Sequence, residues 1–366
     1  MNRLAACLLL PFFLIHPLRF IPHQSTSPSL PIIIDHTCTD IDQVPAYWID
    51  EAKTRFRISY GHTSHGSQVI SGMEVLMLQS GLYAFDHDGT DGALSLHDRT
   101  PSGDLGNPNR TEWYYRTRNL LNDHGSDRNM IMWSWCGQVS TASKNDIDTY
   151  LNLMSSLEQE FSTVTFVYMT GHLDGTGENG NLHQRNNQIR EYCRQNNKVL
   201  FDFADIESYD PDGNYFLDKY ANDECYYDSD GDGVWDANWA DEWCAAHPGE
   251  CSDCVCAHSR PLNCDLKGRA FWWMMARLAG WEAERCDYNN DGVVDRLDLI
   301  AKHTDLSEEM DAWVKDCWDR NDDCADLNGD GLVDENDLKE KQKQISQKLA
   351  EWMEGCGFTK KGRIKR

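Results

Sequence analysis

Short apolar segments alternate with longer amphipathic segments through the first half of this chain, and this alternation constrains its fold most strongly. The pattern predicts strands at residues 56–60, 129–135 and 163–169. It predicts helices at 68–79 and 145–161, where apolar residues recur at helical spacing. Because strands that alternate with helices form parallel sheets, we expect an α/β fold with helices on both faces of a parallel sheet.

Polar residues stand at the ends of several predicted strands. Gly137 and Gln138 follow one strand, and His172 follows the next. Functional sites of open parallel sheets lie at the carboxyl ends of the strands, so these residues are expected close to one site. Two more strands are expected at 82–85 and 198–203, and the Asp-, Gly- and Pro-rich segment 87–110 is predicted to be a loop.

The turn after the first predicted strand reads Gly-His-Thr-Ser-His-Gly and leads directly into a predicted helix. A strand, a tight turn and a helix form the setting of a nucleophile elbow, in which glycines let the backbone bend. Ser64 is the candidate nucleophile, with Thr63 and Ser67 as alternatives. The competing interpretation is a polar, glycine-rich loop without chemistry.

The charge balance and the N-terminus indicate where the protein acts. The chain has 34 Lys and Arg against 60 Asp and Glu, a formal net charge of -26. Nucleic acids and anionic membranes would repel it, so neither is expected as a partner. A basic start and an apolar run at 4–15 predict a signal peptide at 1–24 and a secreted protein. That run is too short to span a membrane, and no other stretch is expected to do so.

The cysteine content points to disulfides. The chain has 14 cysteines, one of them in the predicted signal peptide. Disulfides are the expected state of the others in a secreted protein, and their odd number would leave one thiol free. Cys251, Cys254 and Cys256 suggest a zinc site as the alternative.

The order of segments between residues 58 and 281 resembles the SGNH (GDSL-like) hydrolase superfamily. The block around Ser64 is similar to a His-x-Ser-x-Gly variant of that family's first block. Gly137 and Gln138 stand where the family has a Gly and an Asn that bind the oxyanion, so Gln replaces Asn here. The resemblance implies a flavodoxin-like, three-layer α/β fold and a serine esterase. The backbone N–H of Ser64 and the amide of Gln138 would stabilise the oxyanion.

The family's last block supplies the histidine base, and His258 with the turn and helix after it resembles that block. The family's aspartate lies three residues earlier, where this chain has Val255. Asp253 is the nearest substitute for orienting the imidazole, and a backbone carbonyl is the other. The resemblance therefore implies Ser64, His258 and Asp253 as catalytic residues. Gly137, Gln138 and His172 would line the substrate, although His172 is also a rival base.

Two acidic loops near the C-terminus predict calcium. Each carries oxygen ligands at loop positions one, three, five, nine and twelve, with Gly at position six, where the turn is sharp. The duplicated loops resemble a dockerin module, which implies attachment to a cohesin-like scaffold. The expected ligands are Asp287, Asn289, Asp291, Asp295 and Asp298 in the first loop, and Asp326, Asn328, Asp330, Asp334 and Asp337 in the second.

A third acidic loop with Asp228, Asp230, Asp232 and Asp236 lies inside the predicted hydrolase domain. Its position twelve is Trp239, so Asp241 or Glu242 would have to complete the calcium sphere. We expect a calcium-stabilised, disulfide-braced insertion there. The expected organisation is a hydrolase domain at 32–281 with the insertion near 222–256, a dockerin-like module at 284–350 and a basic tail at 357–366.

Three functions are consistent with these features. The first is a secreted serine esterase that removes acyl groups such as acetyl from carbohydrate, because dockerin-like modules and exported SGNH folds accompany polysaccharide breakdown. The second is an inactive SGNH-fold module that binds carbohydrate or protein. The third is a metalloenzyme that uses His62, His65 and His172.

Overall fold

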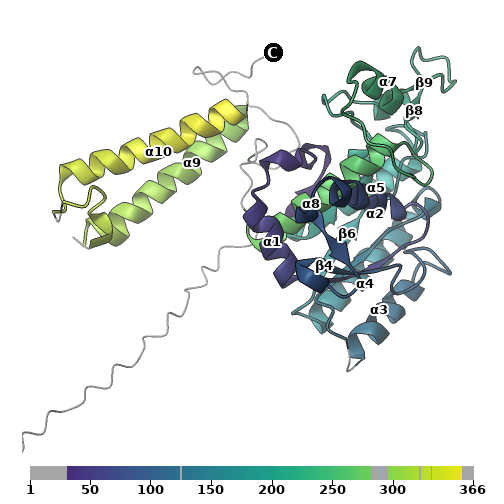
Figure 1. Cartoon of the computed structure of the whole chain (residues 1–366), viewed down its shortest axis with the longest axis horizontal. Coiled ribbons are helices and arrows are strands. Elements are labelled where there is room, and N and C mark those ends of the chain that lie inside the picture. Colours follow the sequence, from purple (N-terminus) through teal and green to yellow (C-terminus); the bar gives the residue numbers. More distant parts are fainter. Residues whose placement is uncertain are drawn as a thin grey trace, which may run out of the picture. The chain divides into compact units, whose positions relative to one another are not determined.

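A computed structural model describes residues 31–123, 126–281, 288, 296–320, 323–330 and 332–356. The chain divides into two compact units, with the boundary between Ala276 and Arg277. The first unit contains a large sheet and the second is helical (Figure 1). Among the described residues, no helix combines the length and the apolar character needed to cross a bilayer.

The sheet has seven strands in the order β1-β7-β6-β5-β2-β4-β3, and every neighbouring pair is parallel. The predicted parallel α/β sheet is therefore confirmed. All carboxyl ends lie along one edge, where β2, β5 and β6 are consecutive neighbours. The strands are β1 Ile32–Ile34, β2 Arg57–Gly61, β3 Phe85–Asp86, β4 Leu94–Asp98, β5 Met130–Trp133, β6 Thr165–Met169 and β7 Val199–Phe201.

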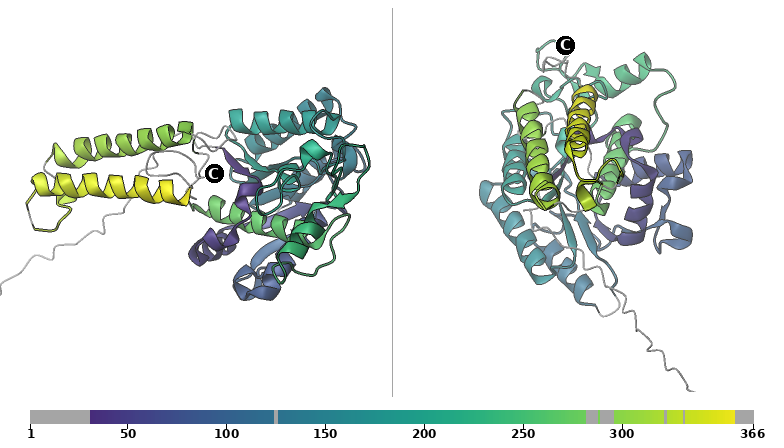
Figure 2. Two further views of the ribbon diagram at one scale, coloured as in Figure 1. Left: turned by 90° about the horizontal axis from the view of Figure 1, so that it is seen from above. Right: turned by 90° about the vertical axis from the view of Figure 1, so that its left-hand side faces the viewer.

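Helices cover both faces of the sheet, as the alternation predicts. The helices that begin in the first unit are α1 Ala46–Arg55, α2 Ser67–Gln79, α3 Glu112–Asn122, α4 Lys144–Glu160, α5 Asn181–Gln195, α6 Phe203–Ile206, α7 Trp239–Ala246 and α8 Pro261–Ala279. In Figure 2 the blue and teal helices α3, α4 and α5 lie on one side of the sheet, and the purple and green helices α1 and α8 lie on the other. On the first side Trp113, Trp133 and Tyr150 are buried in one apolar cluster. On the other side α2 and α8 approach closely, because a Cβ on Gly72 would lie 1.8 Å from the Cys264 carbonyl oxygen.

The prediction for segment 87–110 is wrong in part. Leu94–Asp98 is strand β4, which pairs with β2 and β3 inside the sheet. Leu94, Ser95 and Leu96 are all buried, so sheet pairing decides their conformation against the Gly- and Asp-rich sequence around them. The strand expected at 82–85 is shorter and later, and 81–83 forms a 3₁₀ turn. The three-residue strand β1 carries too short a pattern to be predicted.

The second unit is a pair of long helices, α9 Arg296–Trp313 and α10 Glu335–Gly355, which lie side by side (Figure 1). Glu309 of α9 forms ion pairs with Lys341 and Lys348 of α10, each 2.8 Å long. The small all-α architecture predicted for the C-terminus is therefore present.

Disulfides are present among the described residues, as the cysteine content predicts. The described residues contain the pairs Cys244–Cys251, Cys256–Cys264 and Cys317–Cys324. Cys254 is a free thiol, and Cys251 and Cys256 are oxidised in different pairs, so these three residues do not form the alternative zinc site. The expectation of a single free thiol is wrong, because the described residues include the free thiols Cys136, Cys193, Cys225 and Cys254.

Candidate active site

The predicted elbow exists between β2 and α2. Strand β2 ends at Gly61, a turn follows, and α2 begins at Ser67. The turn is tightly packed, because a Cβ on Gly66 would lie 2.2 Å from Ser134 Oγ and 2.3 Å from His62 Cβ. Only glycine fits between these groups, and this close packing fixes the direction in which the turn's side chains point.

The predicted set of Ser64, His258 and Asp253 is not joined by contacts. Ser64 Oγ lies 3.8 Å from Cys136 Sγ, and the described residues include no hydrogen bond from Ser64 to His258. His258 is exposed, but its ring stacks on His65 at a centroid distance of 4.5 Å. The structure thus brings Ser64 and His258 into one region without forming a nucleophile–base contact.

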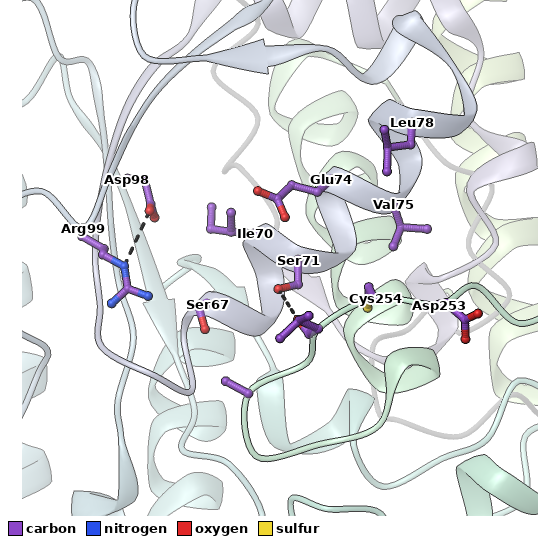
Figure 3. A pocket seen from close by; sticks show the side chains of 12 residues that line it. Ser67, Ile70, Ser71, Glu74, Val75, Leu78, Asp98, Arg99, Asp253 and Cys254 are labelled. Carbon is purple, nitrogen blue, oxygen red and sulfur yellow. Dashed lines mark hydrogen bonds and ion pairs between the residues drawn. The ribbon is translucent and has the colours of Figure 1, made fainter.

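Asp253 belongs to a different surface. It lines a cavity of about 470 Å³ along the outer side of α2, together with Glu74 and Ser67 (Figure 3). The segment before His258 is tied to α2, because Ser71 Oγ donates to the Val255 carbonyl oxygen over 2.9 Å. As a result Asp253 is exposed, and the described part of the chain contains no hydrogen bond or ion pair between it and His258. The prediction that Asp253 orients His258 is not supported.

A different relay converges on the same turn. His65 Nδ1 lies 3.0 Å from Cys136 Sγ, and His65 Nε2 lies 2.9 Å from Asp223 Oδ2. Cys136 follows β5, and Asp223 lies in the segment before the short strand β8 Tyr226–Tyr227. A thiol, an imidazole and a carboxylate in line form the arrangement of a nucleophile, its base and the group that orients the base.

The electrostatics of this relay favour a thiolate. The hydrogen bond from His65 is the largest influence on Cys136, and it lowers the thiol pKa to about 7 against the opposing effect of burial. Burial alone would lower the pKa of His65, but its bonds to Asp223 and Cys136 raise it to about 9. A thiolate beside an imidazolium is therefore the stable state between these two values.

The oxyanion side of the site differs from the prediction. Gln138 does not point its amide into the site, because its Oε1 accepts from the Cys136 N–H over 2.9 Å and its Nε2 donates to Asp104 Oδ1 over 3.1 Å. The Gly137 N–H faces the sulfur and also lowers the Cys136 pKa. Gly137, rather than Gln138, therefore presents a donor beside the nucleophile, and the Ser64 hydroxyl is a second donor at 3.8 Å.

Two alternative nucleophiles have other partners. Thr63 Oγ1 donates to Asp104 Oδ2 over 2.6 Å. Ser67 Oγ donates to the Ser64 carbonyl oxygen over 2.5 Å. Both hydroxyls stabilise the turn, and neither meets an imidazole among the described residues.

His172 is part of the site, as expected from its place after β6. Its Nδ1 donates to the Leu173 carbonyl oxygen over 2.7 Å, and its ring stacks on His65 at 3.7 Å with an interplanar angle of 1°. Its Nε2 is buried and has no hydrogen-bond partner among the described residues. Burial, followed by the charge of His65, lowers the His172 pKa, so this imidazole is neutral beside a charged one.

His62 has different hydrogen-bond partners from the other histidines of the site. Its Nδ1 lies 2.7 Å from the Thr63 carbonyl oxygen and its Nε2 lies 2.6 Å from Asp98 Oδ1. The proposed metal set of His62, His65 and His172 is therefore not brought together. His65, His172 and Asp223 do place three potential ligand atoms within 4.8 Å of one another.

The third acidic loop places carboxylate oxygens of Asp228, Asp230 and Asp232 within 4.8 Å of one another. Asp236 instead accepts from the backbone N–H and hydroxyl of Ser229, each over 3.1 Å. The residues expected to complete the sphere have other partners. Asp241 pairs with Arg260 at 3.2 Å, and Glu242 accepts from the Tyr227 hydroxyl over 2.8 Å.

The second acidic loop is organised around two carboxylates. Asp326 accepts from the Gly329 N–H over 2.8 Å, and the buried Asp337 accepts from the N–H groups of Leu327, Asn328 and Asp334. These backbone bonds lower the Asp337 pKa. Asp330 and Asp334 also accept backbone N–H bonds within the loop. Of the first loop, Asp298 is buried in α9, whereas Asp287, Asn289, Asp291 and Asp295 lie outside the described residues.

No protein-family model, curated protein or solved structure matches this chain significantly. The resemblance to SGNH hydrolases therefore stays a prediction, and the case for a function depends on the geometry of the site.

Proposed function

We propose that this chain is a cysteine-dependent hydrolase of acyl bonds. The observation that carries the proposal is the unbroken relay from Cys136 Sγ through His65 to Asp223, with contacts of 3.0 and 2.9 Å. A thiol at such a distance from an imidazole needs no further base to become a nucleophile. Its position at the carboxyl ends of β5 and β2 is where open parallel sheets bind their substrates.

The reaction follows from the positions of these groups. The Cys136 thiolate attacks the carbonyl carbon of the substrate, and the Gly137 N–H and Ser64 hydroxyl stabilise the oxyanion. When the tetrahedral intermediate collapses, the bond to the leaving oxygen or nitrogen breaks and the His65 imidazolium protonates that atom. His65 then takes a proton from water, the resulting hydroxide attacks the thioester, and the acid and the thiolate are released.

The first test compares two free cysteines. We expect iodoacetamide to modify Cys136 at neutral pH and Cys136→Ala to abolish hydrolysis of p-nitrophenyl acetate. Cys193 is the matched control, because it is a buried free thiol whose pKa burial raises well above its usual value. Cys193→Ala should retain activity. A wild-type protein without reactive Cys136, or a fully active Cys136→Ala variant, would rule the proposal out.

The serine esterase remains a second proposal. Its support is the position of Ser64 Oγ, 3.8 Å from Cys136 Sγ and next in sequence to His65, so a substrate carbonyl at this site is within reach of both groups. An acetylated carbohydrate is the substrate proposed for it. A fluorophosphonate that labels wild type and Cys136→Ala, but not Ser64→Ala, would favour serine chemistry. An absence of both labelling and hydrolysis would favour an inactive binding module.

Calcium binding and secretion complete the proposed function. The three disulfides among the described residues are in keeping with an oxidising compartment. Asp326, Asn328 and Asp330 would supply oxygen ligands of the kind calcium prefers, and the same module would bind a cohesin-like scaffold. Calcium should raise the melting temperature of the full chain, and magnesium at equal concentration should do so less. An unchanged melting temperature would contradict the calcium sites.

A further inference from the structure

His65, the base of the proposed relay, is held between two other imidazoles. The His172 ring stacks on it at 3.7 Å and the His258 ring at 4.5 Å, with interplanar angles of 1° and 15°. Two rings this close to a single face would overlap each other, so His172 and His258 must lie on opposite faces. The plane of His65 is thereby fixed on both sides, and with it the direction of Nδ1 toward Cys136.

The loop that carries His172 is anchored by a buried ion pair. Lys267 of α8 contacts Glu207 Oε1 at 2.7 Å, and neither side chain is exposed. The second oxygen of Glu207 accepts from the Leu173 N–H over 2.7 Å, and the Leu173 carbonyl oxygen accepts from His172 Nδ1 over 2.7 Å. A continuous chain of bonds therefore leads from Lys267 to the first of the two rings.

A second branch from the same ammonium leads to the other ring. Lys267 Nζ donates to Gln68 Oε1 over 2.6 Å, and Gln68 Nε2 donates to the Ala257 carbonyl oxygen over 2.6 Å. Ala257 immediately precedes His258 in the chain. Gln68 is itself fully buried near the start of α2, the helix that follows the elbow. One buried cation thus connects three segments: the elbow helix, the loop after β6 and the loop before α8.

We propose that Lys267 is the positioning residue for the proposed catalytic base, acting through Glu207 on His172 and through Gln68 on His258. Lys267 touches neither Cys136 nor His65 in the contacts of the described residues, so its effect is indirect. The inference depends on the proposed cysteine chemistry and adds a reason for a fully buried Lys–Glu pair. Such a pair is costly to desolvate and is usually no more stabilising than apolar residues of the same size.

The test compares the loss of both branches with the loss of one. Glu207→Met/Lys267→Met replaces the ion pair with neutral side chains of similar volume and removes the acceptor for the Leu173 N–H. Gln68→Met removes only the branch to Ala257. Asp265→Asn is the control, because it removes the charge of a buried carboxylate on α8 that pairs with Arg269 at 3.0 Å, and the contacts of Asp265 in the described part of the chain include neither histidine loop.

The readout is the pH dependence of iodoacetamide alkylation of Cys136, together with kcat and KM for an ester. The groups that face His65 and can titrate are Cys136, Asp223, Glu207, His172 and His258. We expect both variants to raise the pH at which alkylation of Cys136 reaches half its maximal rate. The increase should be about one pH unit in the double variant. We also expect kcat to fall about tenfold with little change in KM, because the base is misplaced and not removed. Asp265→Asn should leave the inflection in place.

The outcomes separate the two proposals. If wild-type Cys136 is not reactive at neutral pH, the cysteine chemistry fails and this inference fails with it. If wild type reacts as expected but both folded variants keep its inflection and kcat, only the positioning role is overturned. If the double variant does not fold, Gln68→Met decides alone, because it keeps the Lys267–Glu207 pair.

Discussion

Two histidines in one turn, His62 and His65, have almost the same surroundings and different chemistry. Both are buried, and each places Nε2 against a carboxylate, Asp98 at 2.6 Å for His62 and Asp223 at 2.9 Å for His65. The difference lies at Nδ1. In His62 this atom lies 2.7 Å from the carbonyl oxygen of Thr63, and in His65 it lies 3.0 Å from Cys136 Sγ.

The comparison shows that a buried histidine–carboxylate pair is not by itself a sign of catalysis. His62 has two structural partners, so it ties the turn to the end of β4 and has no proton to exchange with a nucleophile. His65 has one structural partner and one thiol, and the thiol comes from the end of β5. The role of each histidine therefore depends on the strand that ends beside its ring. This strand is β4 for His62 and β5 for His65.

Replacement of each histidine by glutamine should give the largest contrast. We expect His65→Gln to lower kcat/KM by about 10³-fold, because the thiol loses its general base. The loss should be measurable in ester hydrolysis and as lost alkylation of Cys136 at neutral pH. His62→Gln should lower the free energy of unfolding by about 1–3 kcal/mol, since buried bonds are lost, while the folded protein keeps its activity. Equal losses of activity in the two folded variants would show that the assignment of roles is wrong.

The two carboxylates should differ in the same sense, with a smaller effect. Asp223→Asn removes the charge that favours the His65 imidazolium and should lower kcat by about 10²-fold. Asp98→Asn should leave kcat near the wild-type value, because Asp98 meets a histidine that contacts no nucleophile. Steady-state kinetics on both variants makes the comparison, and circular dichroism confirms that each is folded. If Asp223→Asn and Asp98→Asn have the same kcat, Asp223 is not part of the relay.

The elbow and the strand ends could be predicted from sequence because they depend on local patterns. The apolar runs before Gly61 and Gly137 have the length of strands, and the helix after Ser64 has clear periodicity. The place of His172 near the carboxyl end of β6 could be predicted for the same reason, because it follows that strand in the sequence. What a local pattern does not contain is which of several polar side chains at neighbouring strand ends touch.

Cys136 and Asp223 were missed for different physical reasons. Cys136 adjoins the predicted Gly137, but a disulfide was the expected state of a cysteine in a chain predicted to be secreted. Its place directly after a buried strand was the signal that could have identified it. Asp223 lies 158 residues from His65 and at the start of the predicted insertion, so only the three-dimensional fold brings them together. The oxyanion role of Gln138 was inferred from position alone, and the acceptor Asp104 was not foreseen.

The pH profile should sharpen the difference between the two histidines. With the Cys136 pKa lowered to about 7 and the His65 pKa raised to about 9, the thiolate–imidazolium pair exists between these values. We expect kcat/KM to fall about tenfold for each pH unit below 7, as the thiolate is protonated, and to fall again above 9, as His65 loses its proton. His62→Gln should leave both inflections in place. A profile with a single inflection unaffected by Asp223→Asn would contradict the ion pair.

The smallest expected effect concerns the two hydroxyls that lie between the histidines. Ser64 Oγ is near the sulfur and contributes to the lowered Cys136 pKa, whereas Thr63 Oγ1 donates to Asp104. Ser64→Ala should therefore lower kcat about tenfold, less than the loss of a well-formed oxyanion donor, because the contact is 3.8 Å long. Thr63→Val should affect stability more than kcat. If Ser64→Ala is instead inactive while Cys136→Ala retains activity, Ser64 is the nucleophile, and His65 serves a serine and not a thiol.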